Sequence, residues 1–132
     1  HSMAEQIELV RQHWDDYDFF FVHYKYTDSA GEDGDFRRKV DAISDFDAEL
    51  PGLLGLNPNV MVVTGDHSTP ATMAVHSWHA VPLLVWGDNV RRDACHQFSE
   101  SQCLGGEIGT VPAKEVMPIA FAHAGRLAKF GA

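Results

Sequence analysis

Residues 60–70 read Val60-Met61-Val62-Val63-Thr64-Gly65-Asp66-His67-Ser68-Thr69-Pro70. A β-branched apolar run that ends in glycine and a polar turn is typical of a buried strand feeding a loop at the end of a sheet. Loops held by a rigid sheet often carry functional side chains. Asp66 and His67 follow the glycine, and carboxylate and imidazole groups both bind divalent metals. We therefore expect a strand over 60–64 and a metal-binding turn directly after it.

The composition limits the classes of partner. The 132 residues suffice for one domain or part of one. With 10 basic and 19 acidic residues the net charge is −9, which argues against a nucleic-acid-binding surface. An anionic substrate would need local cations, which bound metals could supply. No apolar run approaches the roughly 20 residues that span a bilayer, so no membrane partner is expected.

Two features of the sequence bear on its origin and location. Cys95 and Cys103 do not make a disulfide scaffold, so we expect a reduced, cytoplasmic protein. The residues His1-Ser2-Met3 are typical of an expression remnant, and we set 1–3 aside from the fold.

The order of the secondary-structure patterns predicts a parallel sheet. The aromatic and β-branched run 17–24 is typical of a strand buried on both faces. Apolar residues at helical spacing predict a helix over 36–50, capped by Asp35 and closed by Pro51-Gly52. Together with the strand at 60–64 this predicts a right-handed parallel βαβ unit.

Three further elements complete the expected layout. Helical spacing also predicts an amphipathic helix over 4–14 and an apolar-faced helix over 112–128. A third short strand is expected over 81–87.

A second acidic segment follows the first expected strand. Residues 25–35 contain two glycines and four acidic residues, which predicts a loop. Asp28 is the acid nearest the strand end and is a candidate metal ligand, with solvated loop acids as the structural alternative. His76 lies between two expected strands, and a second histidine near Asp66-His67 adds to the case for a metal site. His79 is a weaker candidate.

Three stretches resemble one known family. They are 21–35, 62–70, and His76-Ser77 ahead of 81–87, and together they resemble the archaeal-type, cofactor-independent (2,3-bisphosphoglycerate-independent) phosphoglycerate mutases of the alkaline phosphatase superfamily. Residues 117–132 resemble the C-terminus of that family. The resemblance implies a three-layer α/β/α sandwich with a mainly parallel sheet, truncated on one side. It also implies that 4–132 is the C-terminal segment of the catalytic domain.

The resemblance implies a site with two divalent metal ions, manganese or magnesium, with zinc as a further option. Asp28 and His76 would hold one ion, and Asp66 and His67 the other. The ions would activate a serine that moves the phosphoryl group between two carbons of phosphoglycerate in glycolysis. Nothing in this chain matches that serine, and Ser68 does not occupy its position.

One departure from the family pattern leaves alternatives open. Glu32 stands where the family motif has histidine, four residues after Asp28. A carboxylate there would either shift the preference towards harder ions or mark a degraded site. Another phosphoester hydrolase or mutase of the superfamily, and an inactive metal-binding or interaction domain, are the competing interpretations. Missing N-terminal strands would leave an open sheet edge, for which we expect self-association.

Overall fold

The computed structural model describes residues 1–127, and the chain folds into two compact units. Unit 1 comprises residues 1–57 and 68–78, and unit 2 comprises residues 58–67 and those from 79 on. The chain therefore leaves unit 1, returns to it for one short segment, and leaves again. Residue 128 of the helix expected over 112–128, and the last residues of the C-terminal motif, lie outside the described residues.

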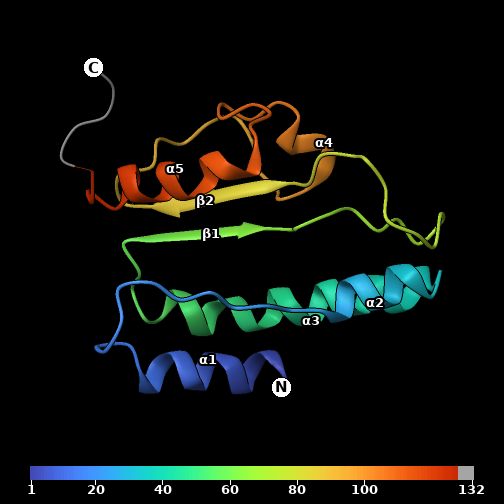
Figure 1. Ribbon diagram of the computed structural model, residues 1–132, viewed down its shortest axis with the longest axis horizontal. Helices are drawn as coiled ribbons and strands as arrows, with labels where there is room; N and C mark the ends of the chain where they lie inside the picture. Colours follow the sequence, from blue (N-terminus) through green and yellow to red (C-terminus); the bar gives the residue numbers. More distant parts are fainter. Residues whose placement is uncertain (128–132) are drawn as a thin grey trace. The chain divides into compact units, whose positions relative to one another are not determined.

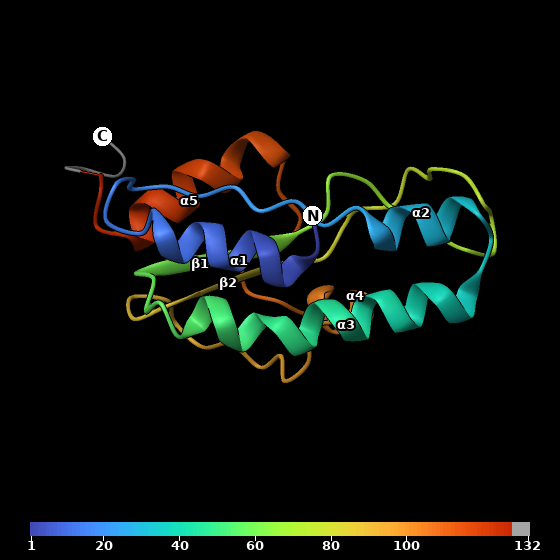
Figure 2. The same cartoon turned by 90° about the horizontal axis from the view of Figure 1, so that it is seen from below.

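Unit 1 is helical, with α1 (Met3–Gln12), α2 (Tyr26–Glu32) and α3 (Phe36–Leu54). Both α1 and α2 pack against α3, the longest helix of the unit (Figures 1 and 2). Few apolar side chains of the described residues are buried, and they come from all three helices: Met3, Ile7, Val10, Ala30 and Ala42. The helices expected over 4–14 and 36–50 are confirmed, although α3 continues through Pro51 to Leu54.

The residues set aside as a remnant contribute to α1. Ser2 is the N-cap, and its hydroxyl accepts from the Glu5 N–H at 3.2 Å while the Glu5 carboxylate accepts from the Ser2 N–H at 2.8 Å. This reciprocal capping box satisfies two backbone donors at the start of the helix. Met3 is only 4% exposed, so residues 2 and 3 belong to the folded structure.

The prediction of a loop over 25–35 is wrong, because most of this segment forms α2. Gly34, at φ +69°, ends this helix. The Asp35 N–H donates to the Ala30 carbonyl at 3.1 Å and the Gly34 N–H to the Gly31 carbonyl at 3.0 Å, which is a Schellman motif. Asp35 then caps α3, as expected, by accepting from the Arg38 N–H at 2.9 Å.

The strand expected over 17–24 is also wrong. The segment is extended, but no strand of the described residues pairs with it. The Gln6 carboxamide makes two hydrogen bonds that a neighbouring strand would otherwise make. It donates to the His23 carbonyl at 2.9 Å and accepts from the His23 N–H at 3.3 Å. Phe20 and Val22 are half-buried whereas Phe21 is 80% exposed, so only one face is covered.

Unit 2 contains the sheet. β1 (Val60–Thr64) and β2 (Leu83–Gly87) confirm the expected strands, and they pair antiparallel with Val62 opposite Val85. The prediction of a mainly parallel sheet is therefore wrong for this pair of strands. Parallel neighbours need a crossover connection, usually a helix, and residues 65–82 contain none.

The rest of unit 2 is short helices and loops. α4 (Glu100–Cys103) is followed by a 3₁₀ turn (Ala113–Glu115) and α5 (Val116–His123), which packs against β1. α5 ends earlier than expected because Gly125, at φ +69°, forms a second Schellman motif. Cys95 and Cys103 are free thiols.

The described residues thus combine helices with a two-stranded sheet. This is α/β structure, and the three-layer sandwich stays a prediction. No described helix has the length and apolar character needed to cross a bilayer.

Candidate metal centre

A close approach within unit 1, between α2 and the segment 68–78, positions Asp28 and His76 of the candidate site. Gly31 is buried, and a Cβ atom at this residue would lie 2.3 Å from the Thr69 carbonyl oxygen. Real Cβ atoms do not approach a backbone oxygen so closely, so only glycine allows this packing. The contact sets α2, and with it Asp28, beside Thr69.

Asp28 is held by neighbours on both carboxylate oxygens. The Thr69 hydroxyl donates to Oδ1 at 2.6 Å, and the Lys25 ammonium pairs with Oδ2. Thr69 is only 4% exposed and the Asp28 side chain only 14%. The Lys39 ammonium donates to the Thr69 carbonyl and so fixes the residue that orients Asp28. A buried, oriented carboxylate is how proteins hold metal ligands in place.

His76 faces this carboxylate from the returning segment. The Ser77 N–H donates to the Ser68 carbonyl at 2.8 Å, in an isolated antiparallel bridge that places the neighbouring His76. His76 Nε2 lies 3.7 Å from Asp28 Oδ1. That is longer than a hydrogen bond of about 2.7–3.2 Å. Two atoms that each lie about 2.1 Å from one ion are at most about 4.2 Å apart. The spacing therefore fits a divalent ion held by both groups.

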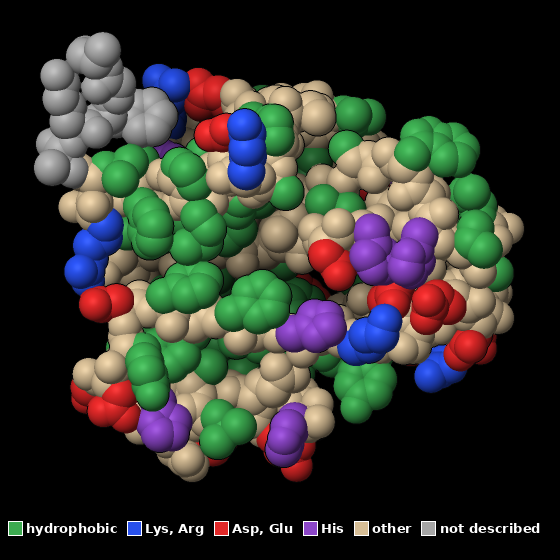
Figure 3. All heavy atoms as spheres, in the orientation of Figure 1, with side chains coloured by type: hydrophobic (Ala, Val, Ile, Leu, Met, Phe, Trp, Pro, Cys, Tyr) green, Lys and Arg blue, Asp and Glu red, His purple; other side chains and the backbone are tan. Residues whose placement is uncertain are grey.

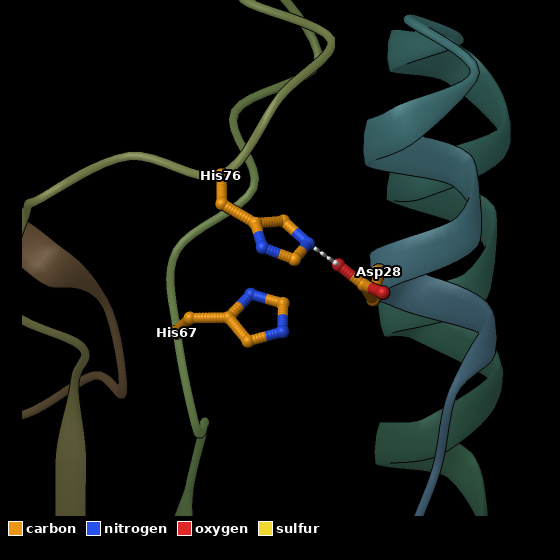
Figure 4. A group of neighbouring side chains, drawn as sticks. All are labelled: Asp28, His67 and His76. Atoms are coloured by element: carbon orange, nitrogen blue, oxygen red, sulfur yellow. Dashed lines mark ion pairs between the residues drawn. The ribbon is translucent and has the colours of Figure 1, made fainter.

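His67 precedes Ser68 directly and completes a group of three ligand side chains. Ligand atoms of Asp28, His67 and His76 all lie within 4.8 Å of one another, and Figure 4 shows the two imidazoles and the carboxylate turned towards one another. Figure 3 shows histidine side chains beside acidic side chains on the visible face, over the part of unit 1 that holds α2. Carboxylate and imidazole donors suit manganese, zinc and similar ions.

Asp66 is placed differently from the other predicted ligands. Its side chain is 77% exposed and its Oδ2 lies 3.5 Å from His67 Nε2. Neither Asp66 nor His79 belongs to the three-residue group among the described residues. The structure thus brings Asp28, His67 and His76 together. Asp66 lies next to His67 but outside this group. The division of these residues over two ions stays a prediction.

Sequence reasoning missed the residues that hold Asp28 in position. Lys25 precedes Asp28 by three residues, a spacing that brings side chains together at a helix, but the segment was expected to be a loop. Nothing local in the sequence points to the pairing of Thr69 with Asp28, since 41 residues separate them.

Comparisons with known proteins extend along nearly the whole chain. A family model described as the Metalloenzyme superfamily matches residues 1–123. Proteins called probable 2,3-bisphosphoglycerate-independent phosphoglycerate mutases are similar over 131 residues. That of Thermotoga sp. (strain RQ2) is 51% identical, and the match covers 99% of this chain and 33% of that protein. That of Aquifex aeolicus is 47% identical, and the match covers 99% and 32%.

A solved structure is similar as well. The PH0037 protein from Pyrococcus horikoshii matches with a TM-score of 0.86 at 36% identity, over 98% of this chain and 39% of that one. The chain spans about a third of the length of the curated relatives it matches. The resemblance to phosphoglycerate mutases is therefore confirmed, for a portion of their length.

Proposed function

The chain belongs to the Metalloenzyme superfamily, and from this we propose that it is the C-terminal segment of the catalytic domain of a metal-dependent phosphoglycerate mutase. The whole polypeptide would interconvert 2- and 3-phosphoglycerate in glycolysis, in the cytoplasm. Its complete catalytic domain would form the three-layer sandwich with a mainly parallel sheet. The observation that carries the proposal is the convergence of the Asp28 carboxylate and the His76 imidazole at 3.7 Å. The names of the similar proteins support the choice of substrate.

The residues of this chain have separate tasks in the proposed reaction. Asp28 and His76 hold one divalent ion, and Asp66 and His67 contribute to a second. Bound ions supply positive charge beside the phosphoryl group during its transfer. Thr69 orients Asp28 through its 2.6 Å hydrogen bond. A serine outside this chain accepts the phosphoryl group from one carbon of the substrate and returns it to the other.

The test is an assay of the whole polypeptide on 2- and 3-phosphoglycerate, beside a general phosphomonoester such as p-nitrophenyl phosphate. We expect interconversion that depends on added divalent metal. Loss of residues that merely orient a ligand costs about 10–100-fold, so Asp28→Asn and His76→Ala should each cost at least about 100-fold. His96→Ala is the control, because that residue is exposed and its hydrogen bond to the Gln102 side chain is made by its backbone N–H, which the substitution keeps.

Three results would contradict the proposal. Turnover of the phosphomonoester alone would favour another phosphoester hydrolase of the superfamily. Unchanged activity of His76→Ala would remove His76 from the reaction, and absence of all activity would favour an inactive metal-binding or interaction domain.

A further inference from the structure

We infer that Lys25 is a substrate-binding residue, whose ammonium group binds the phosphoryl group of the substrate beside the ion held by Asp28 and His76. The inference rests on the proposed metal-dependent function and deepens it, because it assigns the recognition of a phosphomonoester dianion to one side chain of this chain.

Lys25 has a fixed place beside the best-buried ligand. It is the N-cap of α2, and its carbonyl oxygen accepts from the N–H groups of Asp28 and Ser29, both at 3.1 Å. Its ammonium group pairs with Asp28 Oδ2. Asp28 Oδ1 accepts from the Thr69 hydroxyl and faces His76. One carboxylate thus carries an ammonium group on one oxygen and faces the candidate ion site with the other.

The lysine side chain lies on the solvent side of this ion pair. It is 57% exposed, whereas the Asp28 side chain is 14% exposed. An ion pair with an exposed partner contributes little to the stability of a fold. An anion can reach Lys25 from solvent while Thr69 keeps Asp28 in place.

The charges around Asp28 favour an anionic ligand once an ion is bound. Lys25 already balances the Asp28 carboxylate, and a neutral imidazole ligates a metal ion without adding charge. The Glu32 carboxylate, 3.4 Å from His76 Nε2, offsets only part of the charge of a divalent ion. The ion and the ammonium group would then flank one carboxylate, and an anion that contacts both relieves their repulsion.

The residue type favours phosphate over carboxylate as this anion. Lysine binds phosphate as a compact point charge, whereas the planar guanidinium of arginine matches a carboxylate in two parallel hydrogen bonds. Ions held by one or two protein carboxylates commonly take substrate phosphates as further ligands. Since the chain has a net charge of −9, a dianion needs a local cation to approach this region.

The test measures two affinities of the purified protein. Electron paramagnetic resonance gives the affinity for Mn²⁺, and titration calorimetry of the Mn²⁺-loaded protein gives the affinity for orthophosphate. A hydrogen bond between charged groups corresponds to about 10–100-fold in affinity, so Lys25→Met should weaken orthophosphate binding at least about 10-fold. Without phosphate, Lys25→Met should bind Mn²⁺ as tightly as the parent protein or more tightly, because a like charge beside the ion is removed.

Two further variants and a second anion serve as controls. Lys25→Arg keeps the charge and should bind orthophosphate more tightly than Lys25→Met. Lys114→Met removes another exposed lysine, which pairs with Glu115 in unit 2, and should stay within about 2-fold of the parent protein. Glycerate carries a carboxylate but no phosphoryl group, and its affinity should be the same for the parent protein and Lys25→Met.

The outcomes separate this inference from the proposed function. Unchanged orthophosphate affinity in Lys25→Met would make Lys25 only an ion-pair partner of Asp28 and would overturn the inference. Weaker Mn²⁺ binding by Lys25→Met without phosphate would overturn it in favour of a role in orienting Asp28. A loss of affinity for glycerate in place of orthophosphate would overturn the assignment to phosphate. A parent protein that binds no Mn²⁺ would instead overturn the metal centre, and the proposed function with it.

Discussion

At the scale of single residues, the Thr69 hydroxyl is the group that orients the best-buried ligand. It donates to Asp28 at 2.6 Å from a residue that is 4% exposed. Thr69→Val keeps the shape but removes the donor, so we expect Mn²⁺ binding to weaken about 10–100-fold. Isothermal titration calorimetry measures this, and Thr69→Ser, which keeps the hydroxyl, is the matched control. Equal affinities for the valine and serine variants would contradict the assigned role.

A second prediction concerns Asp93 in unit 2. Its carboxylate accepts backbone N–H bonds from Cys95 at 2.8 Å and Glu107 at 3.1 Å, and these bonds hold the pKa of Asp93 below its ordinary value. A pKa that is lower in the folded than in the unfolded state stabilises the protein above the unfolded value, about 3.9. That stabilisation is lost as the pH falls through the folded pKa.

We therefore expect Asp93→Asn to lower the melting temperature at pH 7, with a difference that shrinks as the pH falls towards 3. Thermal unfolding of both proteins across this range measures the effect. A difference that stays constant over the whole range would show that the charge of Asp93 does not contribute.

Residue types and the family resemblance together pointed to the candidate ligands. Asp28, His67 and His76 were predicted from their chemistry, the local pattern and the resemblance, and they lie together. Glu32 was left open as a metal ligand or as the mark of a degraded site, and its Oε1 atom lies 3.4 Å from His76 Nε2. Whether a carboxylate faces a ligand depends on how α2 meets the 68–78 segment, and that packing is not encoded in local spacing.

At the scale of elements, the helices that are stabilised by interactions between neighbouring residues were predicted correctly. The apolar stripes of α1 and α3 and the Asp35 cap are properties of neighbouring residues, and both helices form as expected. The segment 17–24 has strand-like residues, but a strand needs a partner to take its backbone hydrogen bonds, and the described residues supply none. α2 was missed because Gly34 ends a helix there rather than marking a loop.

The contact of α2 with Thr69 gives a prediction at this scale. Gly31→Ala would put a Cβ 2.3 Å from the Thr69 carbonyl oxygen and 2.9 Å from Lys39 Nζ. We expect α2 to move, with a loss of about 1–3 kcal/mol in the free energy of unfolding and weaker Mn²⁺ binding. Denaturant titration and calorimetry measure the two effects.

The control for this prediction is Gly105→Ala. A Cβ at Gly105 would meet its nearest atom, the Gln102 carbonyl oxygen, at an ordinary 3.6 Å. If Gly31→Ala were as stable and bound Mn²⁺ as tightly as Gly105→Ala, the close approach would not be needed for the site.

At the scale of the whole molecule, many large apolar side chains are exposed to solvent. No large side chain of the described residues is fully buried, while Phe21 in unit 1 and Leu104 in unit 2 are 80% and 86% exposed. Figure 3 shows hydrophobic side chains across the visible face. Each strand of the two-stranded sheet also has an edge that no described strand covers. Such edges and patches favour association.

We therefore expect the isolated chain to self-associate as its concentration rises. Sedimentation velocity over a range of concentrations measures this, and Phe21→Ser should reduce the associated fraction. A single monomeric species at high concentration would contradict the expectation.

The central claim is that Asp28 and His76 together hold a divalent metal ion. Its most direct test is Mn²⁺ binding to the purified protein, measured by electron paramagnetic resonance, for the parent protein, Asp28→Asn, His76→Ala and the His96→Ala control. We predict saturable binding that His96→Ala keeps and that Asp28→Asn and His76→Ala each weaken at least about 100-fold. Absence of bound Mn²⁺ at millimolar concentration, or unchanged binding in both ligand variants, would contradict the account.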